Sequence, residues 1–419
     1  MFYLLPFIPD TGDLVAAQKS VRLGNLDVGH GHPVRVMGVI NVSPESFYGA
    51  SIRTEVDQIV ARVLEMEQEG ADLIDVGAAS TAPKQIYGTQ SVDEQQEAFR
   101  IERAMKHVRD ATSLPISVDT TSARTARMAL DLGADIVNDV SGLQRDPEMA
   151  ILIAKKGVPV FIMADCSMPC LSPDAVICSL RTSMATARNS GITTDRIVLD
   201  PGIGFGKPPE ADLHILKTLR RFKLLGQPLL VGVSRKAFLG AVLEEPNPAD
   251  RLTGTIAATA IAVVNGADIV RAHDVNEAKK AVKVGEALRP CIMSQSGSTE
   301  LLCHCNEMDA VVVMEELGVS PVIRKALAKK ALVLNMIVHD VDTPAALIIK
   351  QEMLALGGDA AYHSDTIDHA TEHTDVMIMG NPIQLRKLST RVTKMEDFGL
   401  GKIGKELREL LDVRADTLG

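Results

Sequence analysis

Cysteine is scarce in this chain, with six among 419 residues. The six are Cys166, Cys170, Cys178, Cys291, Cys303 and Cys305. Disulfide frameworks are typical of short secreted chains, so in a chain of this length we expect reduced thiols and a cytoplasmic protein. The spacings within CSMPC at 166–170 and CHC at 303–305 are not those of a zinc ribbon or finger, and a metal role for either stretch stays open.

The sequence also lacks a long hydrophobic run and an excess of basic residues. Its first residues, MFYLLPFIPD, are rich in apolar side chains, but they have no basic segment and Asp13 follows closely. We therefore expect neither a signal peptide nor a membrane span. The formal net charge of −10 argues against a general nucleic-acid-binding protein, although it leaves room for a local cationic site.

What is present is a regular alternation of short apolar runs and helical patterns from Val34 onward. The predicted strands are Val34–Ile40, Leu73–Val76, Pro115–Asp119, Ile136–Asp139, Pro159–Met163, Ile197–Asp200, Leu229–Val233 and Ile269–Arg271. Predicted helices between them include Thr54–Glu69, Ser91–Ala111, Ala211–Leu225 and Asp250–Gly266. Eight strand–helix units within about 255 residues favour an α/β fold of the closed (β/α)8 or TIM-barrel type over a doubly wound open sheet.

Three regions are expected along the chain. Residues 1–33 form an N-terminal segment with a hairpin at the barrel floor, 34–292 form the barrel, and 300–419 form a smaller accessory α/β domain of unknown role. In the accessory domain we expect strands at Ala310–Met314, Val333–His339 and Val376–Met379, and helices at Ser320–Lys330, Thr343–Leu356 and Leu400–Leu411.

Polar or ionisable residues stand at the ends of nearly all predicted strands. They are Asn41, Asp75, Asp119, Asp139, Asp200, Ser234 and Arg271. Each alone could be a helix cap. Seven at equivalent positions favour a functional site, because the carboxyl ends of barrel strands converge on one rim.

Six motifs then stand in register with the predicted strand ends. They are MGVINVSPESF at 37–47, SVDT at 117–120, IVNDV at 136–140, DPGIGFGK at 200–207, VGVSRKAFLG at 231–240 and IVRAHDV at 269–275. Over residues 34–290 the chain resembles the dihydropteroate synthase family. The resemblance implies an enzyme that condenses 6-hydroxymethyl-7,8-dihydropterin pyrophosphate with 4-aminobenzoate, or with an aryl ribosyl phosphate analogue, and releases pyrophosphate in folate or methanopterin biosynthesis.

The resemblance also implies roles for particular residues. The pterin ring is expected to contact Asp119, Asn138, Asp200, Phe205, Gly232 and Lys236. The diphosphate is expected to contact Asn41, Thr81, Arg271 and His273, and Asn41 is also the expected protein ligand of a Mg²⁺ ion. The arylamine acceptor is expected to contact Ser234, Arg235 and Lys84.

Five of these residues, Asn41, Asp119, Lys236, Arg271 and His273, are the expected catalytic set, and no general base is nominated. A homodimer is implied by the family, and no nucleic acid or membrane partner is expected.

One position departs from the family pattern. The second loop of the family reads ESTRPG, and here Ala82 stands in place of its arginine. A charge-assisted contact of that kind is worth about 1.5–3 kcal/mol, so the identity of the acceptor stays open, with Lys84 as a possible substitute. Two further hypotheses are kept: a pterin-dependent methyltransferase, which would not require the VSRK and RAH anion-binding stretches, and a non-catalytic pterin-binding protein.

Overall fold

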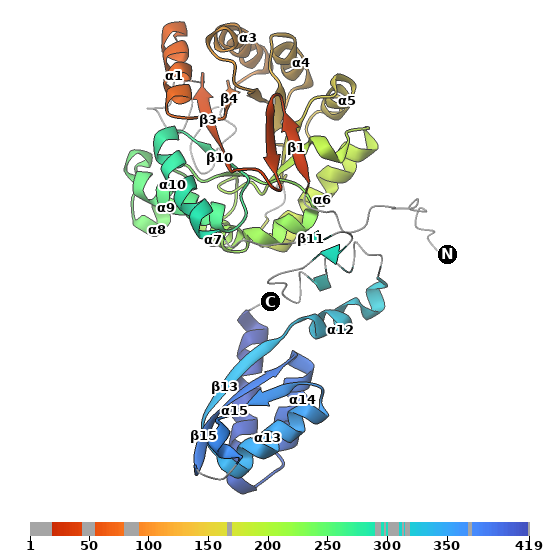
Figure 1. The fold of residues 1–419 in the computed structure, drawn as a ribbon. Coiled ribbons are helices and arrows are strands. Elements are labelled where there is room, and N and C mark those ends of the chain that lie inside the picture. Colours follow the sequence, from red (N-terminus) through yellow and green to blue (C-terminus); the bar gives the residue numbers. More distant parts are fainter. Residues whose placement is uncertain are drawn as a thin grey trace, which may run out of the picture. The chain divides into compact units, whose positions relative to one another are not determined.

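The computed structural model describes residues 19–43, 55–78, 92–165, 170–289, 295–296, 299–300, 310–311, 314, 319–367 and 371–417. The chain divides into two compact units, which part between residues 293 and 294. Figure 1 shows the first unit as a ring of strands surrounded by helices, and the second as a small sheet with its own helices.

The first unit is built on eight parallel strands. They are β3 (Arg35–Asn41), β4 (Leu73–Gly77), β5 (Ile116–Asp119), β6 (Ile136–Asp139), β7 (Val160–Met163), β8 (Ile197–Asp200), β9 (Leu230–Gly232) and β10 (Ile269–Ala272). Neighbours are hydrogen-bonded in the order β8-β7-β6-β5-β4-β3-β10-β9. A parallel bridge between Leu199 and Leu229 joins the two ends of this row, so the sheet closes and the predicted barrel is confirmed.

Helices follow the strands and surround the barrel (Figure 1). They are α1 (Val56–Gln68), α3 (Glu94–Ala111), α4 (Ala123–Asp131), α5 (Pro147–Lys156), α6 (Pro173–Asn189), α7 (Pro209–Lys217), α8 (Ala237–Leu243), α9 (Leu252–Val264) and α10 (Val275–Leu288). Several begin at a capping side chain: Asp93, Ser122 and Asp146 each accept a backbone N–H of the first helical turn. None of the described helices is long and apolar enough to cross a membrane.

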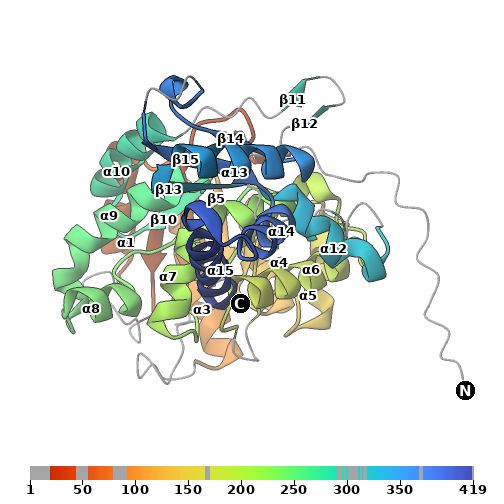
Figure 2. The same cartoon turned by 90° about the horizontal axis from the view of Figure 1, so that it is seen from below.

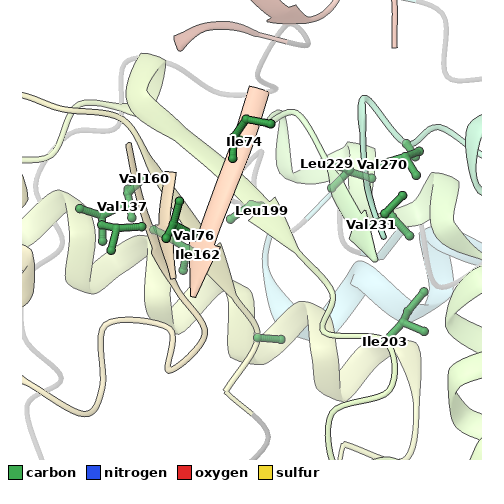
Figure 3. Close-up of a cluster of buried hydrophobic side chains, with 14 of the residues drawn as sticks. Ile74, Val76, Val137, Val160, Ile162, Leu199, Ile203, Leu229, Val231 and Val270 are labelled. Carbon is green, nitrogen blue, oxygen red and sulfur yellow. The ribbon is translucent and has the colours of Figure 1, made fainter. Parts of the chain in front are cut away.

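The alternation of side chains along each strand separates two hydrophobic cores. On β4, Leu73 points into the barrel, whereas Ile74 and Val76 point outward and pack against the helices. Figure 3 shows part of this outer core, including Ile74 and Val76 of β4 and Ile162 of β7. The inner core is smaller and consists of the first inward residue of most strands together with residues of a hairpin.

That hairpin precedes the barrel and fills its floor. Strands β1 (Ser20–Leu23) and β2 (Leu26–Gly29) pair antiparallel, and Val21, Leu23 and Val28 are buried against the inner residues of the barrel. The hairpin therefore closes the end of the barrel opposite to the carboxyl ends of the strands, which leaves that other rim for the polar residues.

The second unit has an antiparallel sheet in the order β13 (Leu334–Asp342), β15 (His373–Gly380), β14 (Asp359–Ala361). Its described helices are α12 (Pro321–Ala331), α13 (Thr343–Ala355), α14 (Pro382–Val392) and α15 (Leu400–Thr417). Helices α14 and α15 lie side by side (Figure 1 and Figure 2). Short strands β11 (Gln295–Ser296) and β12 (Thr299–Glu300) pair with each other.

Two expectations for this unit need correction. The described residues of the expected strand Ala310–Met314 are helical, because a short apolar run does not by itself distinguish a strand from a buried helix. The sequence analysis also missed β14 and α14. Strand β14 has only three residues, too few to show an alternation, whereas α14 begins at the capping box of Asn381 and Gln384, which was a usable signal.

The described cysteines differ from each other. Cys178 is an exposed free thiol, whereas Cys170 is buried and disulfide-bonded. The expectation of reduced thiols is therefore wrong for Cys170, because it rested on chain length and cysteine number, which carry no information on how close two sulfurs come in the fold. The other four cysteines lie outside the described residues.

Candidate active site

The polar residues of the barrel occupy one layer directly above the apolar floor. Because side chains alternate, the residue two positions after each inward floor residue points inward again. The floor residues Leu73, Ile136, Val198 and Ile269 are all apolar. The layer above them contains Asp75, Asn138, Asp200 and Arg271 on the same four strands, with Gly232 on β9 beside Arg271.

Arg271 joins the acidic residues of this layer. Its Nε donates to Asp75 Oδ2 at 2.7 Å, and its Nη2 donates to Asp119 Oδ2 at 3.1 Å. The Asn138 Nδ2 donates to the same Asp75 oxygen at 3.3 Å. Both carboxylates raise the pKa of Arg271 against the effect of its burial, so the guanidinium stays charged within the barrel.

Asp119 is a buried acid with unused hydrogen-bonding capacity. Burial, followed by the nearby Asp75 carboxylate, raises the pKa of Asp119 to about 8, although Arg271 opposes this shift. The Oδ1 of Asp119 and the Oγ of Ser117 are both buried without a hydrogen-bond partner among the described residues. Buried polar atoms are nearly always hydrogen-bonded, so these two oxygens indicate a place where a polar ligand completes the structure.

Glycine-rich residues after β8 form the wall beside Lys236. Gly202 N donates to Asp200 Oδ1 at 2.7 Å, and the buried Lys207 Nζ donates back to the Gly202 carbonyl at 2.5 Å. Lys236 Nζ donates to the Ile203 carbonyl and lies 4.5 Å from the centroid of the Phe205 ring. The fold therefore brings together Phe205 of the motif at 200–207 and Lys236 of the motif at 231–240.

Gly204 is required by this wall for two reasons. Its φ of +79° is in the left-handed region, and a Cβ atom there would lie 2.4 Å from the Lys236 Cδ. Its N–H donates to Asp212 Oδ1 at 2.8 Å, which fixes the loop to α7. The close approach of backbone to Lys236 thus depends on the absence of a side chain at this position.

Burial changes the proton affinity of the acid and the base in this part of the site. It lowers the pKa of Lys236 to about 8, and the carboxylates of Asp200 and Asp212 oppose that shift. Burial also raises the pKa of Asp200, and the charge of Lys236 is the main opposing influence. The two side chains therefore stabilise each other's charged forms, as expected of a site that presents both an acceptor and a donor to one ligand.

Ser234 and His273 form a second contact on the same rim. Ser234 Oγ lies 2.9 Å from His273 Nδ1, and the backbone N–H of His273 donates to the same oxygen at 3.3 Å. Burial, and then the neighbouring Arg271, lower the pKa of His273 to about 3. The imidazole is therefore neutral. Either Nδ1 or the Ser234 hydroxyl can donate in this contact, and the tautomer in which the hydroxyl donates has its ring proton on Nε2, which is then a donor.

Arg235, between Ser234 and Lys236, is turned to other partners. Its Nε and Nη2 donate to the two carboxylate oxygens of Asp274 at 2.8 and 2.9 Å, and its Nη1 donates to the carbonyls of Pro248 and Ala249 at 3.0 and 2.6 Å. These contacts do not support the expected contact between Arg235 and the acceptor, because the guanidinium is buried among partners of the protein itself.

The structure brings most of the expected site residues to one rim. Ring-contacting candidates Asp119, Asn138, Asp200, Phe205, Gly232 and Lys236 belong to the inward layer and the loop beside it. Asn41 ends β3, opposite Gly77 of β4, and is half-buried. Thr81 and Lys84 lie outside the described residues, as does Ala82.

One strand-end residue does not belong to the rim site. Asp139 follows the inward Asn138 on β6 and therefore points outward, where its Oδ1 accepts from the N–H and hydroxyl of Ser141 at 2.7 and 2.6 Å. The expectation that all seven strand ends converge is wrong for this residue. Asp75 is among the strand-end residues expected at the rim but had no assigned role, and Ser117 was not expected there, although the period of two along β5 places it on the same face as Asp119.

The described residues of this site offer few ligands to a metal ion. No group of three or more His, Cys, Asp or Glu side chains suited to a metal occurs in the part of the chain that the structure describes. Asn41 is the strand-end residue with an amide oxygen outside the Arg271 network. This donor set fits a Mg²⁺ ion that takes most of its oxygen ligands from a phosphorylated substrate and water.

Comparison with known proteins places this arrangement in a family. A family model described as pterin binding enzyme matches residues 37–273. The dihydropteroate synthase of Clostridium beijerinckii is 35% identical over 272 residues, which cover 64% of this chain and 99% of that protein. That of Synechocystis sp. is 37% identical over 262 residues, covering 60% of this chain and 89% of that protein.

Solved structures give the same result. A dihydropteroate synthase from Coxiella burnetii in complex with pteroic acid has a TM-score of 0.59 and 32% identity, and covers 65% of this chain and 100% of its own. One from Xanthomonas albilineans with 4-aminobenzoic acid has a TM-score of 0.59 and 33% identity, and covers 66% of this chain and 100% of its own. The second unit lies beyond the residues that the family model matches.

Proposed function

This chain belongs to the dihydropteroate synthase family of pterin-binding enzymes, and from that membership we propose the reaction that it catalyses. The pterinylmethyl group of 6-hydroxymethyl-7,8-dihydropterin pyrophosphate passes to the amine of 4-aminobenzoate, or of an aryl ribosyl phosphate. The observation that carries this proposal is the inward layer of the barrel. Buried carboxyl groups of Asp119 and Asp200 lie there with the cations of Lys236 and Arg271.

The ring of the substrate suits this layer. An aminopyrimidine edge offers N–H donors, which fit the oxygens of Asp119 and Asp200 and the amide of Asn138. Asp119 Oδ1 has no partner among the described residues, so a ring N–H would satisfy it. Lys236 Nζ supplies a charged donor to a ring nitrogen or carbonyl, and the lack of a side chain at Gly232 keeps the space beside Lys236 Nζ and Arg271 free of a further side chain.

Transfer breaks the bond between the methylene carbon and the diphosphate oxygen. The electron pair leaves with that oxygen, the lone pair of the amine forms the new C–N bond, and the amine proton passes to solvent. Positive charge develops on the pterin and negative charge on the leaving group, so placed donors lower the barrier. Arg271 and the Nε2–H of His273 supply such donors, and Thr81, outside the described residues, stays a predicted third.

A Mg²⁺ ion fits this site through Asn41. When bound to the diphosphate, the ion neutralises part of the negative charge that builds on the leaving oxygens. Asn41 supplies one amide oxygen at the end of β3, and the absence of a three-ligand cluster among the described residues agrees with an ion that arrives with its substrate. Removal of free Mg²⁺ by a chelator is expected to slow turnover without loss of the folded barrel.

Fewer described contacts support the proposed binding of the arylamine acceptor. Ser234 lies beside His273, where an arylamine could approach the methylene carbon, and Lys84 remains a predicted contact outside the described residues. The alanine at position 82 removes the family's charged contact from this side. The choice between a plain benzoate and a larger phosphorylated acceptor is therefore the part of the proposal that most needs an experiment.

The test is a pyrophosphate-release assay with 6-hydroxymethyl-7,8-dihydropterin pyrophosphate. It compares 4-aminobenzoate with its ribosyl phosphate counterpart, each with and without Mg²⁺. Amine-dependent release with either acceptor supports the proposal and identifies the acceptor class. If the pterin substrate binds but no amine causes release, the chain is a pterin-binding protein without this activity, and the proposal fails.

A further inference from the structure

We infer that Arg235 and Asp274 are a positioning pair, which holds Ser234 against His273 and so sets the place of the diphosphate. The inference rests on the proposed function and deepens it, because it assigns Arg235 to the anion half of the site. Two chain segments meet here, residues 234–236 after β9 and residues 273–274 after β10. Neither Arg235 nor Asp274 has to touch a substrate for this role.

The contacts between the two segments are paired. The guanidinium of Arg235 makes a two-pronged ion pair with Asp274, with distances of 2.8 and 2.9 Å. The preceding Ser234 makes the contact with the preceding His273, 2.9 Å from Oγ to Nδ1. Two adjacent residues on one segment thus bind two adjacent residues on the other, and a bidentate ion pair fixes orientation as well as distance.

The backbone of Arg235 is held in an uncommon conformation. Its φ is +56°, a left-handed value that side chains other than glycine seldom adopt. The backbone N–H donates to Thr255 Oγ1 at 2.9 Å, and the backbone carbonyl accepts from Arg251 Nη1 at 3.1 Å. Such strain persists where the surroundings fix it, and here it reverses the chain so that Ser234 and Lys236 both serve the site.

The side chain of Asp274 does not cap its own helix but binds Arg235. It occupies the position before the first residue of α10, where an aspartate usually accepts a backbone N–H of its own helix. No such side-chain bond is present at α10, and both carboxylate oxygens go to Arg235 instead. The other side of this segment is held by Arg62 of α1, whose Nη2 donates to the His273 carbonyl at 2.7 Å.

The ion pair between Arg235 and Asp274 should therefore affect binding of the diphosphate and not binding of the pterin ring. In the inferred arrangement the Ser234 hydroxyl, 2.9 Å from Nδ1, donates to that nitrogen, and the proton of His273 is then on Nε2, the donor toward the diphosphate. If the ion pair loosens, Ser234 shifts and the imidazole loses both its orientation and its tautomer. The ring contacts of Asp119, Asp200 and Asn138 come from other strands and are not affected.

The experiment measures two affinities of the full-length protein in parallel. Variants Asp274→Asn and Arg235→Lys are titrated with inorganic pyrophosphate in the presence of Mg²⁺, and separately with 6-hydroxymethyl-7,8-dihydropterin, which has no phosphate. We expect pyrophosphate to bind about tenfold more weakly to each variant, because a misplaced donor costs that order of affinity, whereas the pterin affinity stays within about twofold. Asp131→Asn, which breaks the exposed 2.6 Å pair with Lys156, is the matched control and changes neither affinity.

Ser234→Ala completes a double-mutant cycle. Since Asp274 acts through Ser234, the variant with both Ser234→Ala and Asp274→Asn should bind pyrophosphate no more weakly than Ser234→Ala alone. Additive losses would overturn the inference. It would also fail if Arg235→Lys raised only the arylamine KM, since that result assigns Arg235 to the acceptor directly.

Failure of the fold and failure of the proposed function give different results. If the ion pair only stabilises the fold, its loss lowers the affinities for pyrophosphate and pterin and the Tm together. In that case Asp274→Glu, which keeps the negative charge, serves as the second variant. Wild-type protein that does not bind pyrophosphate at all contradicts the inference. Wild-type protein that binds pyrophosphate, but releases none from the substrate with any amine, contradicts the proposed function alone, because the cycle needs no turnover.

Discussion

Asp119 and Lys236, two buried side chains of the candidate site, have pKa values far from their ordinary values in water. Burial disfavours the charged form of any group, so acids gain proton affinity and bases lose it. Asp119 and Lys236 both have a pKa of about 8, although their ordinary values are 3.8 and 10.5. An acid and a base that titrate in the same range can respond to a ligand that carries its own donors and acceptors.

Asp119→Asn is expected to stabilise the protein at high pH. The native state keeps the Asp119 proton up to about pH 8, whereas the unfolded chain loses it near 3.8. The stability from this group is therefore fully present below pH 3.8 and is lost as the pH rises through 8. Asparagine has no proton to lose, so the Tm of the variant should exceed that of the wild type by several degrees at pH 9, with no gain at pH 3.

Thermal unfolding at the two pH values checks this expectation. Asp131→Asn on the exposed end of α4 serves as the control, since it changes no buried charge. An equal effect of Asp119→Asn at both pH values would show that the carboxyl group does not titrate with folding. The same substitution should also weaken binding of the pterin substrate, because asparagine cannot lose a proton and become the carboxylate that accepts ring N–H groups with both oxygens.

The lowered pKa of Lys236 predicts a second effect of pH, on the affinity for the pterin, which can be measured separately from stability. Pterin affinity should fall as the pH rises through about 8, because Lys236 then loses the proton that it donates to the ring. The Asp212 carboxylate raises the pKa of Lys236, so Asp212→Asn should move this fall to lower pH. The asparagine oxygen can still accept a hydrogen bond from Gly204 N, as Asp212 Oδ1 does at 2.8 Å, so the loop should keep its conformation.

A fluorescence titration of 6-hydroxymethyl-7,8-dihydropterin across pH 6 to 10 measures this shift. Asp212 is not among the charges that act on Asp119, so a shifted profile identifies Lys236 as the titrating group. Unchanged profiles of the wild type and Asp212→Asn would remove Lys236 from the assignment.

At the scale of elements, the β1–β2 hairpin determines the floor on which the site stands. Leu23 is fully buried at the centre of the inner core, between the first inward residues of the strands. The polar layer begins one step above, so the floor keeps water away from the lower side of the Arg271 network. A domain of this type needs such a plug because the strand ends at the floor would otherwise be open.

Leu23→Ala is expected to destabilise the barrel by about 2–5 kcal/mol, the usual cost of removing a buried leucine side chain. For a unit of this size that corresponds to a Tm lower by roughly 5–10 °C. Ile151→Ala on the exposed face of α5, where the side chain is 53% exposed, is the control and should change the Tm little. A small effect of Leu23→Ala would show that the hairpin does not support the core.

At the scale of the whole molecule, the two units have separate hydrophobic cores. Among the described residues, the buried residues of the first unit's cores extend to Val282, and those of the second unit's core begin at Val341. The family model matches residues 37–273, which lie in the first unit, and the match to the Clostridium beijerinckii protein covers 99% of that protein. The residues that match pterin-binding enzymes therefore lie in the first unit.

Removal of the residues after 297 should leave a folded and active barrel. The first unit carries its complete inner and outer cores, so its thermal transition should stay within a few degrees of the corresponding transition in the full-length chain. Calorimetry of both proteins, together with the pyrophosphate-release assay, measures this. An insoluble product, or a barrel without pterin affinity, would show that the second unit is needed for folding or for the site.

The sequence by itself determined the barrel fold and most residues of the candidate site. Short, mostly continuous apolar runs, separated by helical patterns, predicted all eight strands within a few residues, because parallel strands buried on both sides have this recognisable pattern. The motifs predicted Asp119, Asn138, Asp200, Lys236 and Arg271, which the fold brings to one layer. In the second unit the same reasoning was weaker, since the short run at 310–314 proved helical in its described residues.

Only the tertiary structure decided how these residues act on one another. A strand end alone does not reveal direction, so Asp139 was grouped with the site although the pleat turns it outward. Asp75 and Arg271 are 196 positions apart, and their 2.7 Å contact exists because the closed sheet brings β4 and β10 to one interior. Arg235 likewise binds Asp274, a partnership that forms across neighbouring strands and that no local pattern encodes.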